Sequence, residues 1–232
     1  MGEYVKLIIL ERNAHESIRE YVYRMLRFNI IHLNLKPGQN ISEQEIAGRI
    51  GVSRTPVREA FIKLAQENLL DIFPQKGTSI SLIDIEQVEE SKFARDILER
   101  EVVLQASQSF PGDFLFQLQS HLVFQELCVK EKDFQKFFDS DEKMHGTIFA
   151  GCGKNRTWSM LQQMNAQYNR VRMLNLSVRY DFEQLYLQHK ELVDTIRGKN
   201  PSHAREIIDQ HLNKMTIDLE LLRQEYQFYF KG

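Results

Sequence analysis

Four side chains in the C-terminal half of the chain are of the kinds that bind divalent transition metals. They are one carboxylate and three imidazoles, namely Asp141, His145, His189 and His211. Asp141 and His145 are four residues apart, so on a helix both side chains project from the same face. His211 lies among apolar residues that should face the interior of a helical bundle, and His189 follows Leu185 by four positions. If these four groups converge, they would bind a divalent transition metal.

The spacing alone leaves other interpretations of these residues open. Asp141 and His145 could be an exposed pair on one helix, worth only a few tenths of a kcal/mol. Histidines on apolar faces are often hydrogen-bonded core groups. A bound ion with open positions could activate water in a hydrolase-like enzyme, or it could serve only to stabilise the bundle. Since the sequence offers no evident general base beside the site, the enzyme is the weaker alternative.

The candidate metal ligands are expected on helices of an all-α domain. Residues 84–87 form a capping box, which predicts the start of a long helix that runs to about residue 108. Gly and Pro residues separate five further predicted helices, at 113–130, 132–150, 154–178, 181–198 and 201–229. Asn200 suits the N-cap of the last helix and Pro201 its first position. The sequence therefore predicts a six-helix bundle.

A second pattern, in the N-terminal third, predicts a helix that can enter a DNA groove. Ser53 is a good N-cap residue, and Pro56 fits the first helical turn. Apolar residues recur at helical spacing, as a buried stripe requires: Val57, Ala60, Phe61 and Leu64. Three polar residues lie off that stripe, at the end where helix-turn-helix proteins meet bases and phosphates: Arg54, Thr55 and Arg58.

The flanking segments complete a winged helix-turn-helix. Ser42 followed by Glu45 predicts a capping box and a short first helix, which Gly51 ends in a left-handed conformation. Asn68 can also take the left-handed conformation and end the groove-binding helix. Two apolar segments then surround residues 74–78, which predicts a β-hairpin wing.

One further helix is predicted ahead of this motif, over residues 13–34. Its apolar face should pack behind the groove-binding helix and consists of Ile18, Val22, Leu26, Ile30 and Leu33. The fold class is thus mainly α, with a winged helix-turn-helix domain over residues 1–82 and the helical bundle over residues 83–232.

Composition allows two domains with cores of their own but does not itself point to DNA. The chain has 232 residues, 42% of them hydrophobic, and a formal net charge of −2. Residues 1–82 hold 11 Lys and Arg against 9 Asp and Glu, so DNA affinity must come from the placement of a few basic residues. The chain has two cysteines and no apolar run of transmembrane length. We therefore expect a reduced, cytoplasmic protein without a membrane partner.

Three short motifs within residues 15–82 carry a resemblance to a known DNA-binding module. They are Pro37 with Gly38, residues 52–60, and Lys76 with Gly77. Together they resemble the winged helix of GntR-type bacterial transcription regulators. In that family the arginines matching Arg54 and Arg58 reach bases and phosphates, and the residue matching Thr55 contacts the backbone.

The resemblance to GntR-type regulators implies a DNA-contacting surface. Its members would be Ser42, Gln44, Arg49, Ser53, Arg54, Thr55, Pro56, Arg58, Lys76 and Gly77. Gln44 stands where some members of the family carry an arginine, and a glutamine there could read adenine. Asn68 replaces the Gly usual at its position, a change that its tolerance of the left-handed conformation explains.

A second resemblance covers residues 84–225. Residues 95–99, 141–145 and 153–155, with His189 followed by Gly198 and His211, resemble the FCD effector-binding domain of the FadR-like GntR branch. The six-helix count is similar to that of the VanR-type subgroup. In metal-containing members, the matching residues hold zinc, nickel or a similar ion, and a carboxylate-bearing metabolite completes its coordination. The resemblance thus implies a metal at Asp141, His145, His189 and His211, with zinc expected ahead of nickel.

Two arginines are implied as effector contacts. Arg95 matches a position that faces the effector pocket of the family, where its guanidinium could clamp a carboxylate. The alternative, which weighs equally, is an ion pair between Arg95 and Glu99 across one helical turn. Arg172 is expected to line the same cavity.

Together the two resemblances imply a metabolite-responsive bacterial transcription regulator. A homodimer would place two groove-binding helices on a near-palindromic operator. A small organic acid at the metal would repack the bundle and change operator affinity, and repression is the expected sign. The competing functions remain a metal-dependent hydrolase-like enzyme and a DNA-binding regulator whose ion is purely structural.

Overall fold

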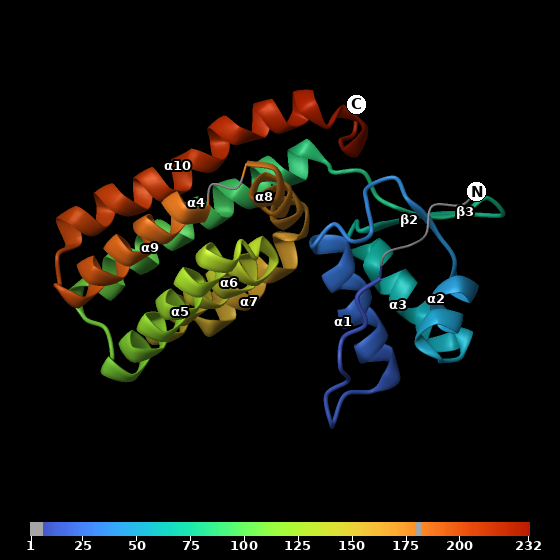
Figure 1. The fold of residues 1–232 in the computed structure, drawn as a ribbon, viewed down its shortest axis with the longest axis horizontal. Coiled ribbons are helices and arrows are strands. Elements are labelled where there is room, and N and C mark those ends of the chain that lie inside the picture. The colour runs from blue at the N-terminus through green and yellow to red at the C-terminus, as the bar shows by residue number, and fades with distance from the viewer. Residues whose placement is uncertain (1–6, 180–181) are drawn as a thin grey trace. The chain divides into compact units, whose positions relative to one another are not determined.

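A computed structural model describes residues 7–179 and 182–232, apart from the side chains of residues 179 and 214–218. Two compact units are present. One consists of the described residues up to Ile85 together with Tyr226–Gly232, and the other is Glu86–Glu225. Figure 1 labels most of the helices and strands of both units. None of the helices in the described ranges combines the length and the apolar composition needed to cross a bilayer.

The first unit is a winged helix-turn-helix, as the sequence predicts. Its elements are α1 (Ile18–Ile31), β1 (Asn40–Ile41), α2 (Glu43–Ile50), α3 (Arg54–Gln66), β2 (Leu70–Phe73) and β3 (Gly77–Ile80). Helix α3 packs against α1 and α2, and the stripe Val57, Ala60, Phe61 and Leu64 is buried. The predicted hairpin of β2 and β3 pairs Leu70 with Ile80. The short strand β1, which the sequence did not predict, pairs with β3 and gives the antiparallel order β1-β3-β2.

Local signals at the two helices of the motif are confirmed in part: one hydrogen bond of the predicted capping box at Ser42 and the end of α2 at Gly51 are present. Ser42 Oγ accepts a hydrogen bond of 3.1 Å from the Glu45 backbone N–H, and Gly51 ends α2 with φ +70°. Ser53 occupies the N-cap position of α3, but within the described residues its side chain makes no capping hydrogen bond. The third helical position, a usual donor to such a cap, is Pro56, which has no N–H.

Helix α1 is shorter than the predicted range 13–34. It begins after Ser17, which forms a reciprocal capping box with Glu20, and ends before Leu33, which has a φ of +57°. Val22, Leu26 and Ile30 form the buried face as predicted, whereas Ile18 is 44% exposed. Ile18 is exposed because it lies in the first turn.

The second unit is all-helical. Its helices are α4 (Ile85–Gln108), α5 (Gly112–Glu131), α6 (Phe134–Gly151), α7 (Asn155–Met164), α8 (Ala166–Arg179), α9 (Phe182–Arg197) and α10 (Pro201–Glu225). Its core includes Val103, Leu118, Met144, Leu192 and Ile208, from five of these helices. An all-helical domain is thus confirmed.

The helix predicted over residues 154–178 is instead the pair α7 and α8. The break falls at Asn165, whose ψ of 6° departs from the helical value. Asn165 is fully buried, and neither polar atom of its side chain has a hydrogen-bond partner among the described residues. Asparagine favours helix ends over helix interiors, so the sequence does carry a weak signal for this break.

The C-terminal end also differs from the predicted helix 201–229. Helix α10 ends at Glu225, and a short 3-10 turn (Gln227–Tyr229) follows. Phe230 then forms a parallel bridge with Ile83, in which the Ile83 N–H donates to the Tyr229 carbonyl at 2.8 Å and the Lys231 N–H to the Ile83 carbonyl at 2.9 Å. The terminal residues therefore belong to the first unit.

This arrangement predicts a stabilising role for Phe230. Phe230→Ala should lower the free energy of unfolding by about 3 kcal/mol, because the Phe230 side chain is only 4% exposed. The matched control is Phe228→Ala, since Phe228 is 69% exposed and its loss should cost less than about 0.5 kcal/mol. Urea unfolding of the full chain measures both. Equal effects of the two substitutions would contradict this role for the tail.

Candidate metal centre and nucleic-acid interface

The four candidate metal ligands come together in the helical unit. Asp141 and His145 project from α6, His189 from α9 and His211 from α10. One ligand atom from each of the four lies within 4.8 Å of the others. Asp141, His145 and His189 are buried, and His211 is half-buried. Three imidazoles and a carboxylate at this spacing could hold a divalent metal.

The imidazole nitrogens that face Asp141 are the strongest sign of such a site. His189 Nε2 lies 3.1 Å and His145 Nε2 3.7 Å from Asp141 Oδ1. Both nitrogens are buried, and neither makes a well-formed hydrogen bond within the described residues. Buried polar atoms normally have partners. A metal ion between these atoms would satisfy all of them.

The opposite nitrogen of each histidine is held by a polar side chain. The Nδ1 contacts are Glu99 Oε2 at 3.2 Å from His145, Gln125 Oε1 at 2.8 Å from His189, and Gln188 Oε1 at 3.3 Å from His211. Where a glutamine oxygen accepts from Nδ1, as the contacts of His189 and His211 allow, Nε2 is left with a lone pair that can coordinate a metal. Groups of this kind orient metal-binding histidines. No short-range pattern in the sequence indicates these contacts, because each of them joins two different helices.

Burial adjusts the protonation of this donor set. Burial lowers the pKa of His189, and burial together with the neighbouring His189 and His145 holds the pKa of His211 well below its ordinary value. Burial alone would raise the pKa of Asp141, but Arg172 and His145 outweigh it and hold that pKa well below its usual range. The site therefore favours the ionised form of Asp141 and the neutral forms of His189 and His211, which are the forms that coordinate a metal.

Arg95 and Arg172 pair with carboxylates of the cluster and its surroundings. Arg95 Nε donates to Glu99 Oε1 at 2.5 Å, so the ion pair across one helical turn is present. Arg172 pairs with Asp141 Oδ2. Each guanidinium thus supports the cluster, Arg95 through the Glu99 contact with His145 and Arg172 through Asp141 itself.

Glu142 joins the two arginines and is a residue that the sequence analysis missed. Its Oε1 accepts from Arg95 Nη1 at 2.7 Å and also from Arg172 Nη1. Burial would raise the pKa of Glu142, but the two guanidinium groups outweigh it and lower the pKa to about 2. The sequence alone does not indicate this role of Glu142, because its two arginine partners lie on other helices, α4 and α8.

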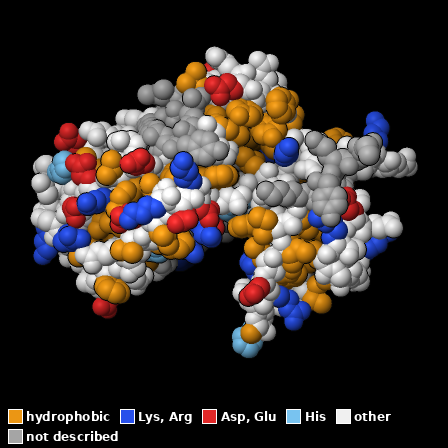
Figure 2. All heavy atoms as spheres, in the orientation of Figure 1, with side chains coloured by type: hydrophobic (Ala, Val, Ile, Leu, Met, Phe, Trp, Pro, Cys, Tyr) orange, Lys and Arg blue, Asp and Glu red, His pale blue; other side chains and the backbone are white. Residues whose placement is uncertain are grey.

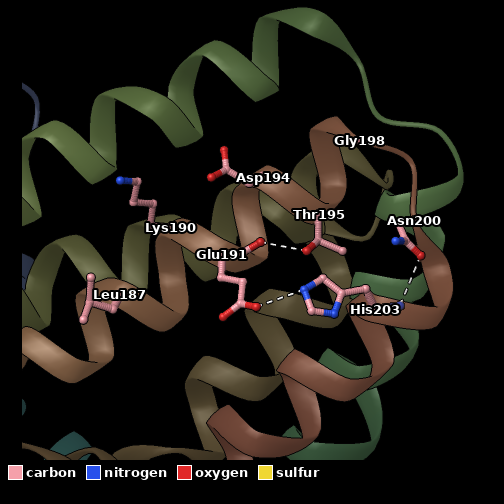
Figure 3. A pocket seen from close by; sticks show the side chains of 8 residues that line it. All are labelled: Leu187, Lys190, Glu191, Asp194, Thr195, Gly198, Asn200 and His203. Carbon is pink, nitrogen blue, oxygen red and sulfur yellow. Dashed lines mark hydrogen bonds and ion pairs between the residues drawn. The ribbon is translucent and has the colours of Figure 1, made fainter.

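A separate exposed histidine provides a contrast to the buried cluster. His203 lies with Glu191 and Asp194 in an open groove of about 400 Å³ at the end of α9 (Figure 3). Its Nε2 lies 2.9 Å from Glu191 Oε1, and both side chains are more than a third exposed, so the pair contributes little stability.

The residues predicted to contact DNA all lie in the first unit. Arg49 and Pro56 are half-buried, and the other members are exposed, namely Ser42, Gln44, Ser53, Arg54, Thr55, Arg58, Lys76 and Gly77. Arg54 Nη2 lies 3.1 Å from Glu43 Oε2, but Arg54 is largely exposed and this pair is easily exchanged for a phosphate. Figure 2 shows charges of both signs interspersed over the visible face, which agrees with a local rather than global basic character.

Comparison with known proteins identifies both units. Residues 18–80 match the family model described as bacterial regulatory proteins, gntR family, and residues 92–214 match the FCD domain. The chain is 29% identical to the HTH-type transcriptional repressor RspR of Escherichia coli (strain K12), over 94% of this chain and 96% of that protein.

Two further similarities support the same grouping. An uncharacterised HTH-type transcriptional regulator from an unstable DNA locus of Streptomyces ambofaciens is 32% identical, over 88% of this chain and 86% of its own. The solved structure of E. coli McbR/YncC superposes with a TM-score of 0.76 at 20% identity, over 91% of this chain and 99% of that one. The latter similarity shows a shared fold.

The positions of the donor atoms predict which histidine substitution removes the metal from the protein. His189→Ala should abolish stoichiometric zinc, because it removes a buried donor whose Nε2 faces Asp141. His203→Ala is the matched control, being an exposed histidine of the same unit. Zinc per chain after dialysis, measured by atomic emission, distinguishes them. Undiminished zinc in the His189 variant would show that the ion binds elsewhere.

Proposed function

This chain belongs to the gntR family of bacterial regulatory proteins and carries an FCD domain, and we propose that it is a metal-dependent, carboxylate-responsive repressor. It acts in the cytoplasm as a homodimer on a near-palindromic operator. The observation that carries the sensing function is the set of inward-facing donors of Asp141, His145 and His189. Within the described residues, the Nε2 atoms of His145 and His189 lie near Asp141 Oδ1 but make no well-formed hydrogen bond.

Zinc is the proposed ion, with nickel as the alternative. The donor set has three imidazoles and one carboxylate, a combination that suits either metal and that neither calcium nor magnesium prefers. An ion held by Asp141, His145, His189 and His211 supplies a Lewis-acidic position at which a further anionic donor can bind. Arg95 and Arg172 provide a second source of positive charge beside it.

The effector that this environment favours is a small carboxylate. Its carboxylate would meet both the ion and the guanidinium groups of Arg95 and Arg172, and charge-assisted hydrogen bonds to arginine are among the strongest that a protein can offer. Arg172 contacts Asp141 directly, so an effector bound there also alters the surroundings of a metal ligand. That change gives the effector a means of acting on the packing of the bundle.

Regulation fits these residues better than catalysis. Glu99, Asp141 and Glu142 are each paired with an arginine, and their pKa values are all lowered, after the opposing effect of burial has been overcome. A carboxylate in that state is a poor proton acceptor at neutral pH. The carboxylates next to the proposed ion are therefore poorly suited to act as the general base of a hydrolase.

DNA binding is assigned to the exposed residues at the start of α3 and at the wing. Arg54, Thr55 and Arg58 would meet bases and phosphates, with Ser42, Gln44, Arg49, Ser53, Pro56, Lys76 and Gly77 completing the surface. In a symmetric dimer, the two copies of α3 would meet half-sites about 34 Å apart. Because the first unit has only a small excess of positive charge, the second set of DNA contacts that a dimer provides is important for affinity.

Arg58 provides the test of the DNA surface. Arg58→Ala should weaken operator binding by about tenfold or more, the cost of losing one arginine contact to a base or phosphate. Lys130→Ala is the charge-matched control on α5, where Lys130 is exposed and paired with Glu126. Binding is measured by fluorescence anisotropy on a duplex selected from random DNA by the wild-type protein. Wild-type affinity in the Arg58 variant would exclude this surface.

Metal-dependent stabilisation tests the effector site. In a thermal-shift panel of small carboxylates, at least one should raise the melting temperature of the zinc-loaded protein, because a ligand that binds only the native state stabilises it. The shift should disappear after chelation, with the fold retained. A carboxylate response that survives chelation would show that the ion is not part of the effector site, and loss of the fold on chelation with no response would favour a purely structural ion.

A further inference from the structure

We infer that Glu142 is an internal competitor for the effector: in the absence of effector its carboxylate occupies the two-arginine clamp, and an incoming carboxylate binds by displacing it. This inference rests on the proposed carboxylate-sensing function and adds a residue that sets the affinity of the site. The first support is direct contact. A single oxygen of Glu142, Oε1, accepts hydrogen bonds from Arg95 Nη1 and Arg172 Nη1.

The two arginines do not depend on Glu142 for their position. Arg95 is also bound to Glu99, and its guanidinium lies 5.6 Å from the ring centroid of Trp158 and 5.8 Å from that of Tyr168. Arg172 is also bound to Asp141 and lies 5.0 Å from the ring centroid of Phe138. Because these contacts remain when Glu142 leaves, the clamp stays formed and ready for another carboxylate.

Of the three carboxylates in this network, Glu142 is the one whose side chain reaches an open groove. Its side chain is 14% exposed, compared with 1% for Glu99 and 4% for Asp141. It lines an open groove of about 470 Å³, together with Gln117, His121, Lys143, Trp158 and Gln162. Gln162 Nε2 donates to Glu142 Oε2 at 2.8 Å, so the outward-facing oxygen is already bound to the wall of this groove.

The groove therefore provides both the path for the effector and the destination of the displaced side chain. Glu142 lies at its boundary with the buried arginines. Rotation of the Glu142 side chain toward Gln162 and Lys143 would keep its charge in a polar environment. The space that it vacates lies beside Arg172, which contacts the metal ligand Asp141.

An internal competitor also makes the site selective. An anion that only pairs with the arginines gains little over Glu142, which already makes the same contacts. A carboxylate that in addition coordinates the ion has a further interaction that Glu142 does not provide. The competitor thus filters out simple anions and favours carboxylates that engage the metal.

Neutralising Glu142 distinguishes a competitor from a positioning residue. Glu142→Gln keeps the size of the side chain and removes its charge, and acetate serves as the minimal carboxylate probe. In the zinc-loaded full chain, the variant should bind acetate at least about tenfold more tightly than wild type, because the charged partner of the clamp has been removed. Calorimetric titration gives both affinities, and zinc per chain confirms that the metal site is intact.

The control and a second variant complete this test. Glu126→Gln removes the same charge from an exposed position on α5 and should bind acetate as wild type does. Glu142→Ala should also strengthen acetate binding. The test therefore remains valid if one of the two Glu142 variants fails to fold. If wild type binds acetate and neither Glu142 variant binds it more tightly, the competitor role is wrong while carboxylate sensing stands. If no form binds acetate or any carboxylate of the panel, the proposed function fails.

Discussion

Buried charge is the constraint on which the helical unit depends. Arg95, Glu99 and Asp141 are almost fully buried, and Arg172 and Glu142 are nearly so. An isolated charge in such a place would be very costly, so each must be paired. The pairs join α4, α6 and α8, and they can form only when these helices are packed in one arrangement. The requirement to pair these charges therefore specifies how the helices meet.

The cluster of candidate metal ligands follows from the same constraint. The arginines hold Asp141 and Glu99 ionised, and Glu99 in turn contacts His145. Gln125, on α5, makes the corresponding contact with Nδ1 of His189. Among the described residues, His145 Nε2 and His189 Nε2 face Asp141 without a well-formed hydrogen bond, and a cation bound between them would complete the network. A site of this type is preorganised, because its ligands are fixed by neighbours before the ion arrives.

Local chemistry explains what could be predicted from the sequence. Ser42, Gly51 and the apolar stripe of α3 each act within a few residues, and the structure confirms them. The candidate ligands were found because their residue types are unusual in an apolar core, and the structure brings them together. Glu142, Gln125 and Phe230 were missed because their partners lie 30 or more positions away or on other elements. No short-range pattern records such a contact.

Two of the helices that carry residues of the site, α4 and α10, adjoin the DNA-binding unit along the chain. Helix α4 carries Arg95 and Glu99 and is preceded by Ile83, whereas α10 carries His211 and is followed by Phe230. The backbone bridge between Ile83 and Phe230 ties these two continuations together. If an effector changes the helical unit as proposed, the chain offers two connections to the winged helix, one at the start of α4 and one at the end of α10. A coupling free energy of about 1–3 kcal/mol between effector binding and operator binding would be enough for a switch. The effect of the ligand would reach the winged helix through two covalent connections instead of one.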